Sequence, residues 1–237
     1  MLILISNINY GLVNSMRMRK KKWARPELAA CEYFIDEPEK IKGQWKNGFE
    51  KEQPLFLELG CGKSPFLAKM GLLHRDINFI GIDMISDVLG VARRNISKSY
   101  EEAGIEKVDN IFLSAYNIER IENIFDENDV IERIYINFCN PWPKDRHHKR
   151  RLTYNTFLRK YKVFLKNGGE IHFKTDDDEL FEDSLIYFEE EKLELIKKSY
   201  DVHADESWGE NVETEHEMMF SSQGIKIKGA ILRYNKD

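Results

Sequence analysis

The sequence predicts an α/β protein whose mostly parallel β-sheet is covered by helices on both faces. Two observations lead to this fold class. Short β-rich runs alternate with longer helical segments over residues 55–191, and such alternation is typical of parallel strands joined by crossover helices. The 237 residues are 42% hydrophobic and 32% charged, as in soluble globular proteins. At this length one large domain with a substantial core is expected.

The predicted elements follow one another regularly along the chain. Five β-rich runs are predicted strands: Leu55–Leu59, Asn78–Ile82, Ile111–Ser114, Arg133–Phe138 and Glu170–Thr175. Longer segments with helical periodicity are predicted helices: Pro65–Leu73, Ile85–Ala103, Thr153–Leu165 and Glu179–Glu191. Two final strands, Leu193–Val202 and Gly229–Tyr234, are expected to pair in antiparallel fashion at one edge of the sheet. The polar segment His203–Lys228 joins them.

The N-terminal residues differ from the rest of the chain in composition. Residues 1–50 are expected to form a basic, partly flexible segment ahead of a single domain at residues 51–237. Between Arg17 and Arg25 there are six basic residues and no acidic one. Met16 and Met18 lie at the start of this run, so residues 1–15 are interpreted as an extension ahead of the working N-terminus.

The net charge of -5 conceals an uneven distribution. The second basic run, Lys144–Arg151, has five basic residues and one acid, whereas Asp176–Glu217 has 17 acids and three lysines. This polarity fits a protein that presents one basic face to a polyanion. Each basic run taken alone could equally be a solvated surface segment.

Several classes of protein are excluded by composition. The three cysteines, Cys31, Cys61 and Cys139, form no CxxC pair, which argues against a disulfide scaffold or a structural zinc site. No apolar run approaches the roughly 20 residues needed to span a bilayer, so no membrane association is expected. The positive charges follow the apolar start of the chain, the reverse of a secretory signal. A cytoplasmic protein is therefore expected.

The first predicted strand ends in a nucleoside-binding pattern. Glu58 is followed by Gly60 and Gly62, which allow a sharp turn and close approach of the backbone to a ligand. Asp83, at the end of the second strand, is placed to accept hydrogen bonds from both ribose hydroxyls. A dinucleotide site would need a third glycine at position 65, where the chain has Pro65. S-adenosylmethionine, which has a ribose but no phosphates, fits better than NAD.

The fourth predicted strand runs into a proline-rich loop and the second basic run. Pro141 and Pro143 flank Trp142 and stiffen the loop, which is suited to presenting groups to a substrate. An aromatic surface beside fixed positive charge is common in RNA recognition. Adjacent His147 and His148 point in different directions and are expected to lack a third ligand nearby, so no metal site is expected.

These motifs resemble the bacterial tRNA (guanine-N7-)-methyltransferases, which are class I S-adenosylmethionine-dependent enzymes. The resemblance extends from about Arg17 onward and rests on RMRKKKWA, ELGCGK, GID, NPWPKDRHHKRRL, HFKTD and TEHE. It implies a Rossmann-like fold with a mostly parallel seven-stranded sheet and an antiparallel edge strand. It also implies methylation of N7 of a guanosine at position 46, in the variable loop of tRNA, with S-adenosylmethionine as the methyl donor.

The resemblance also implies roles for individual residues. The expected cofactor contacts are Glu58, Gly60, Gly62, Asp83, Asn117 and Asn140. The expected substrate contacts are Lys144, Asp176, Thr214, Glu215, His216 and Glu217, and the RNA-binding segment is Arg146, His147, His148, Lys149, Arg150 and Arg151. Three positions depart from the usual family pattern. Asn140 and Asn117 stand where acids are usual, and His216 replaces a tyrosine or phenylalanine. Asn140 is the candidate catalytic position, with its usual acid replaced.

The chemistry agrees with this resemblance. N7 of guanine carries a free lone pair, so methyl transfer needs alignment of the reacting atoms and no general base. Asp176 or Glu217 could accept from guanine N1–H and N2–H, and Lys144 could reach O6. Asp176 could equally be the N-cap of the following helix.

Three other functions are weighed against this one. A non-catalytic RNA-binding module would have no use for Asp83, and an NAD-dependent oxidoreductase should have the third glycine. A methyltransferase acting on an exocyclic amine is the nearest rival, because Asn140-Pro141-Trp142 resembles an Asn-Pro-Pro-aromatic loop. The sequence leaves open which tRNAs are modified and whether the enzyme is a monomer or a homodimer.

Overall fold

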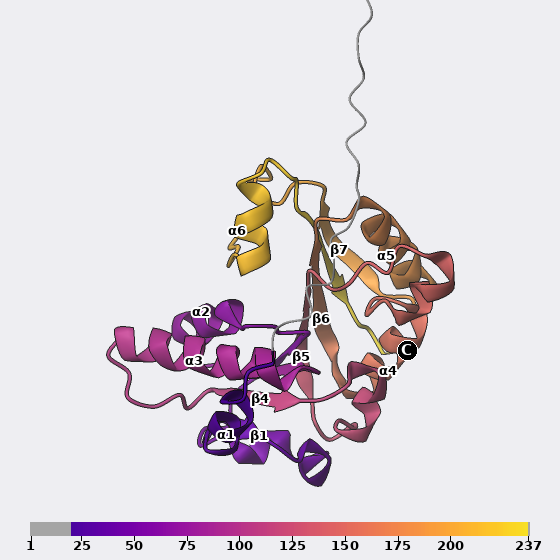
Figure 1. Ribbon diagram of the computed structural model, residues 1–237. Helices are drawn as coiled ribbons and strands as arrows, with labels where there is room; N and C mark the ends of the chain where they lie inside the picture. Colours follow the sequence, from indigo (N-terminus) through magenta and orange to yellow (C-terminus); the bar gives the residue numbers. More distant parts are fainter. Residues whose placement is uncertain (1–19, 237) are drawn as a thin grey trace, which may run out of the picture.

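The computed structural model describes residues 20–236 and contains one mixed β-sheet between two layers of helices (Figure 1). The strands of this part of the chain are β1 (Phe34–Ile35), β2 (Leu55–Leu59), β3 (Asn78–Asp83), β4 (Ile111–Ala115), β5 (Ile131–Asn137), β6 (Leu165–Thr175), β7 (Glu194–Ser199) and β8 (Lys228–Arg233). The α-helices are α1 (Ala24–Ala29), α2 (Pro65–Leu73), α3 (Ser86–Glu102), α4 (Asn155–Phe164), α5 (Asp178–Glu190) and α6 (Glu215–Ser221). Short 3-10 helices are η1 (Pro38–Ile41), η2 (Trp45–Gly48), η3 (Ile118–Asn123) and η4 (Asp145–Arg150).

The order of the strands creates a crevice in the middle of the sheet. The order is β1-β4-β3-β2-β5-β6-β8-β7, and every pair is parallel except those that involve β8. From β2 the chain proceeds outward through β3 and β4, and then returns to place β5 on the other side of β2. In open α/β sheets ligands bind beyond the carboxyl ends of the strands at such a switch point.

The predicted fold class is confirmed, with differences at the edges. All seven predicted strands are present, and the final two pair in antiparallel fashion as expected. The reversed strand, β8, lies one position in from the edge, and β7 is the edge strand. The sheet also gains the two-residue β1, which pairs with β4. The segment predicted only as a polar connection, His203–Lys228, contains α6.

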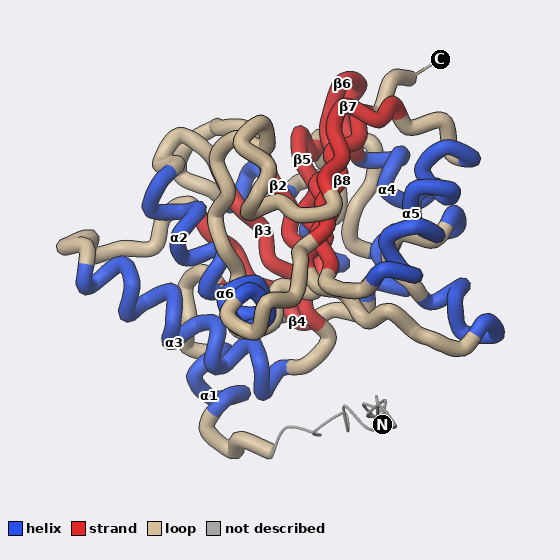
Figure 2. Tube along the Cα trace, turned by 90° about the horizontal axis from the view of Figure 1, so that it is seen from above, coloured by secondary structure: helices blue, strands red, loops and turns tan. Residues whose placement is uncertain are grey.

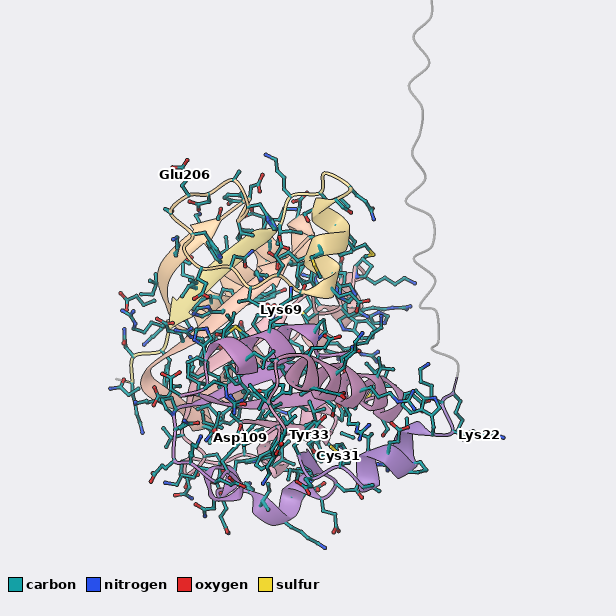
Figure 3. The ribbon with its side chains drawn as sticks, turned by 90° about the vertical axis from the view of Figure 1, so that its left-hand side faces the viewer. Lys22, Cys31, Tyr33, Lys69, Asp109 and Glu206 are labelled. Carbon is teal, nitrogen blue, oxygen red and sulfur yellow. The ribbon has the colours of Figure 1, made fainter. Side chains whose placement is uncertain are left out.

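Residues 20–50 lie against the sheet and its helices. The Trp45 side chain is completely buried, and its indole Nε1 donates to the Ile124 carbonyl at 2.7 Å. The Tyr33 hydroxyl, labelled in Figure 3, donates to the Arg93 carbonyl of α3 at 2.7 Å. Gly90 allows α1 to approach α3 closely, since a Cβ there would lie 2.6 Å from Ala24 Cβ. The extension interpreted from the sequence at residues 1–15 lies outside the described residues.

The alternation of side chains along β2 decides where its one carboxylate points. Leu55, Leu57 and Leu59 face the apolar cluster that includes α4 and α5, whereas Phe56 faces the cluster beneath α2 and α3. Because strand side chains alternate, Glu58 shares the face of Phe56. A carboxylate is thus held within the α2 side of the core, at the end of a central strand.

Candidate active site

The predicted glycine turn follows β2 and has left-handed backbone at both glycines. Gly60 has a φ of 76° and Gly62 a φ of 56°. A Cβ at Gly60 would meet nothing within 4 Å, so the requirement for glycine there is the backbone conformation. Gly60 N–H donates to the Ile82 carbonyl at 2.8 Å, which ties the turn to β3.

Asp83 is held by backbone groups at the end of β3. Its Oδ2 accepts from Gly62 N–H at 3.1 Å and its Oδ1 from Ile85 N–H at 2.9 Å. Burial raises the pKa of Asp83, while the hydrogen bonds from Ile85 and Gly62 oppose the shift. The structure therefore joins the predicted turn and the predicted ribose carboxylate directly.

Asn117 lies at the end of β4, beside Asp83. Tyr116 N–H donates to the Asp83 carbonyl at 2.9 Å, which places the two strand ends together. The Asn117 side chain caps η3 by accepting from Glu119 N–H at 3.0 Å. The predicted cofactor residues Glu58, Asp83 and Asn117 thus lie at the ends of three adjacent strands, and their roles stay predictions.

A cavity of about 330 Å³ separates the glycine turn from α6. Glu58 lines it and is only 3% exposed. Lining residues also come from the turn, α2, α3, the end of β5 and α6: Gly60, Cys61, Gly62, Lys63, Pro65, Phe66, Val88, Asn137, Phe138, Thr214, Glu215, His216 and Met219. A smaller cavity of about 180 Å³ shares Phe66 and Asn137 with it but is not lined by the turn.

Glu58 and Asn137 form a pair at the floor of the larger cavity. Asn137 Nδ2 donates to Glu58 Oε1 at 3.0 Å, whereas Glu58 Oε2 and Asn137 Oδ1 are buried without a hydrogen-bond partner. Burial raises the pKa of Glu58 to about 8; the hydrogen bond from Asn137 and the positive charge of Lys174 oppose this, and the negative charge of Asp83 adds to it. Asn137 was not among the predicted site residues, although its position at the end of a central strand was a signal.

The loop after β5 has left-handed backbone at two aromatic residues, both of them half-buried. Phe138 has a φ of 51° and Trp142 a φ of 46°, which is unusual for bulky residues. Asn140 is exposed, and its Oδ1 accepts from Trp142 N–H at 3.0 Å. Asn140 does not line the larger cavity. Its carbonyl oxygen retains one lone pair for another donor.

The second basic run divides between the surface and the interior. Lys144, Arg146, Lys149 and Arg150 are exposed and His147 is half-buried, whereas Arg151 is completely buried. The Arg150 guanidinium lies 5.1 Å from the centre of the Trp142 ring. The role of Arg146, His147, Lys149 and Arg150 in RNA binding stays a prediction.

The prediction that Arg151 binds RNA was wrong. Its Nε donates to the Pro141 carbonyl at 2.6 Å, its Nη2 donates to Glu179 at 2.9 Å, and its Nη1 donates to Asp183. A guanidinium that is buried and engaged with three acceptors cannot reach a phosphate. Arg151 instead fastens the proline-rich loop to α5.

His148 also faces α5. Its Nε2 lies 3.3 Å from Glu179 Oε1, and its Nδ1 lies 3.7 Å from Asp183 Oδ2. The sequence argument that no third metal ligand lies near His148 was therefore wrong, because these three residues have the composition of a metal site. Arg151 donates to the same two carboxylates, so its guanidinium already neutralises part of their charge.

The predicted motif TEHE begins α6 and divides into two pairs of residues. Thr214 is the N-cap and forms a capping box with Glu217, and both side chains are buried. Glu215 and His216 are exposed and line the cavity. The T-x-x-E pattern is a capping-box signal from which the start of this helix could have been predicted. The prediction that Glu217 contacts substrate was wrong, because its carboxylate is enclosed by protein donors.

Asp176 lies at the end of β6, near His216. The structure separates its two predicted roles: Asp177 is the N-cap of α5, and its Oδ1 accepts from Leu180 N–H at 2.7 Å. Burial raises the pKa of Asp176, and a backbone hydrogen bond and the positive charge of Lys228 oppose the shift. Its carboxylate is therefore not used to cap the helix and stays a candidate substrate contact.

Comparisons with known proteins place the chain in a family. Residues 52–230 match the family described as putative methyltransferase. The chain is 56% identical over 213 residues to a tRNA (guanine-N(7)-)-methyltransferase of Clostridium beijerinckii, covering 90% of this chain and 96% of the relative. It is 57% identical over 219 residues to one of Clostridium perfringens strain SM101, covering 92% and 99%.

Solved structures support the fold alone. The structure of the 16S rRNA methyltransferase KamB aligns with a TM-score of 0.56 at 9% identity, covering 78% of this chain and 89% of that one. The plantazolicin methyltransferase BpumL, solved with SAH, aligns with a TM-score of 0.50 at 13% identity, covering 84% and 82%. Among the described residues, no helix combines the length and apolarity required to cross a bilayer. By its sequence relatives, which match over nearly their full length, this chain belongs to the tRNA (guanine-N(7)-)-methyltransferase family.

Proposed function

We propose that this protein transfers a methyl group from S-adenosylmethionine to N7 of guanosine 46 in the variable loop of tRNA. The observation that carries the proposal is the pair of buried oxygens without partners, Glu58 Oε2 and Asn137 Oδ1, in a cavity beside the glycine turn. The same strand that supplies Asn137 continues into the loop that carries the exposed basic residues.

The residues around the cavity fit S-adenosylmethionine. The ammonium of its methionine part needs acceptors, and Glu58 and Asn137, which line the cavity, each have one oxygen without a hydrogen-bond partner in the protein. Asp83, fixed by the turn, is placed to accept from the ribose hydroxyls. When bound, this cofactor supplies a methyl group attached to a positively charged sulfur.

The protein's own residues bind and orient the guanine. Because N7 has a free lone pair, no residue has to remove a proton, and the contribution of the site is alignment, which can amount to roughly 7 to 11 kcal/mol. Asp176 is the acceptor for guanine N1–H and N2–H, and Lys144 is the donor to O6. His216 offers a ring beside Phe138, with their centroids 6.0 Å apart.

Asn140 shapes the loop that follows β5. Its side chain closes a turn onto Trp142 N–H, and the turn presents Trp142 together with Lys144. Arg146, Lys149 and Arg150 are exposed and would meet the phosphates of tRNA. Such electrostatic contacts position the RNA, and they carry no sequence information themselves.

The test is methylation of an unmodified tRNA transcript with labelled S-adenosylmethionine, followed by nucleoside analysis. We expect label in 7-methylguanosine, and none in a matched transcript in which guanosine 46 is replaced by adenosine. Label in a guanosine methylated on its exocyclic amine would overturn the proposed N7 chemistry. Binding of tRNA without any label would instead indicate a non-catalytic RNA-binding module.

A further inference from the structure

A buried lysine on β6 is bonded to the segment that leads into α6. Lys174 is 7% exposed. Its Nζ donates to Glu217 Oε2, to Asn211 Oδ1 at 2.9 Å and to the Val212 carbonyl at 3.3 Å. All three acceptors belong to residues 211–217, which are far along the chain from Lys174. One ammonium group therefore ties a central strand to the start of α6.

Glu217 is enclosed by donors on both of its carboxylate oxygens. Besides Lys174, its Oε2 accepts from Thr214 N–H at 3.4 Å, and its Oε1 accepts from Asn211 Nδ2 at 2.6 Å. His203 Nε2 lies 3.1 Å from the same Oε1. A carboxylate offers about four lone-pair positions, and these four groups occupy them. Glu217 is fully committed to protein contacts and does not line the larger cavity.

The helix that this network holds stands apart from both helical layers. Figure 1 shows α6 joined to the rest of the protein by loops at each end, and Figure 2 shows it over the side of the sheet that α2 and α3 cover. It has only seven residues, too few to be stable as an isolated helix. Its ion pair with the glycine turn, Lys63 with Glu215 at 2.8 Å, lies at the cavity between partly exposed groups and is therefore weak.

We propose that Lys174 is a positioning residue for the methyl transfer, which holds α6 through Glu217 so that Glu215 and His216 face the cavity. This inference rests on the proposed function. Lys174 is the second-last residue of β6, and Asp176 directly follows Thr175, the last residue of that strand. Asp176 and α6 are thus both attached to the same end of β6, a strand in the interior of the sheet. This attachment fixes the distance between Asp176, the acceptor for the guanine edge, and the cofactor cavity that α6 lines.

The first test replaces Lys174 by a nonpolar residue of similar length. In Lys174→Met the buried Glu217 loses its cation, and one partner of a buried pair left alone is strongly destabilising. We expect single-turnover methylation to fall by about 100-fold or more. Hydrogen exchange should accelerate in residues 211–221 and remain unchanged in α4 and α5. Activity within threefold of the wild type, or unchanged exchange in residues 211–221, would overturn the proposal.

The second test separates positioning from direct substrate contact. Adding Glu217→Gln to Lys174→Met removes the uncompensated negative charge of Glu217. We expect the double variant to be at least tenfold more active than Lys174→Met, because the amide can still accept from Thr214 N–H. If Glu217 instead touched guanine, the double variant would be no more active than Lys174→Met. Lys174→Arg, which keeps the charge, should retain most of the activity; a loss equal to that of Lys174→Met contradicts the proposal.

Two controls make the outcomes distinguishable. Lys162→Met removes a lysine on α4 that lies 3.0 Å from the buried Glu191, away from the cavity, and should change stability without changing the methylation rate. Hydrogen exchange is measured without tRNA, so it tests the anchoring of α6 even if the product is not 7-methylguanosine. A product other than 7-methylguanosine would therefore contradict the proposed function. Unchanged hydrogen exchange of residues 211–221 in Lys174→Met would contradict the role of Lys174.

Discussion

Asn137 Nδ2 donates a hydrogen bond of 3.0 Å to Glu58 Oε1 and links the carboxyl ends of β5 and β2. These strands are neighbours at the switch point of the sheet. The bond uses one oxygen of Glu58 and leaves the other buried without a partner. The centre of the sheet thus holds a buried acidic group, and burial raises its pKa to about 8.

The first prediction concerns the stability of the cofactor-free protein at high pH. Burial raises the pKa of Glu58 from 4.5 to about 8, so its favourable contribution is fully present below pH 4.5 and is lost as the pH rises through about 8. Glu58→Gln removes this titration. Between pH 6 and pH 9 we expect the wild type to lose about 2 to 3 kcal/mol more free energy of unfolding than the variant.

Urea unfolding at the two pH values measures this difference. Glu102→Gln, on the exposed end of α3, is the control and should follow the wild type. If the wild type and Glu58→Gln lost the same free energy of unfolding between pH 6 and pH 9, Glu58 would be ionised over that whole range. The same variant should bind S-adenosylmethionine more weakly, because an amide offers no charge to an ammonium.

The second prediction concerns Asp83. Asp83→Ala should weaken S-adenosylmethionine binding by about 1.5 to 3 kcal/mol, because the ribose loses a charge-assisted contact. The side chain also accepts from Gly62 N–H, so part of the loss comes from a looser turn. Calorimetric titration measures the affinity. Asp76→Ala, exposed ahead of the opposite end of β3, should bind normally, and normal binding by Asp83→Ala would place the cofactor elsewhere.

The third prediction separates two adjacent arginines. Arg150 is exposed, so Arg150→Gln should weaken tRNA binding and flatten its dependence on salt, because fewer counterions are released. Arg151 is buried and bonded to Glu179 and Asp183, so Arg151→Gln should lower the thermal unfolding temperature. Binding titrations at several salt concentrations test the first change. An unaltered salt slope for Arg150→Gln would identify that residue as part of a solvated surface.

The fourth prediction concerns Asn140, where an acid is usual in the family. Asn140→Asp keeps the oxygen that accepts from Trp142 N–H and adds a negative charge. Because attack by N7 requires no proton removal, the rate should change within roughly tenfold, or 1.4 kcal/mol. Single-turnover methylation across a range of pH measures it. A gain of several orders of magnitude with a new acidic limb would require a general base at this position.

Long periodic segments were predictable because local pattern and tertiary environment agree there. β2 and α2 begin and end where the sequence predicts, since a continuous apolar run and a helix-starting proline mark them. The two-residue β1 was not predictable, because Phe34 and Ile35 become a strand only by pairing with Leu113 and Ser114 of β4. The seven-residue α6 was missed for a related reason, since its stability comes from contacts with β6.

The sequence by itself determined the α/β fold, the glycine turn, the carboxylate at the end of β3 and the family. Each depends on residues that are close together in the chain or on a pattern that repeats along it. Only the tertiary structure decided that Arg150 faces solvent while Arg151 is buried, because the acids that bind Arg151 lie 28 and 32 residues away on α5. It likewise paired Glu217 with Lys174, 43 residues away. The sequence shows which side chains are charged. Whether such a side chain points to solvent or to the interior depends on the partners that folding brings near it.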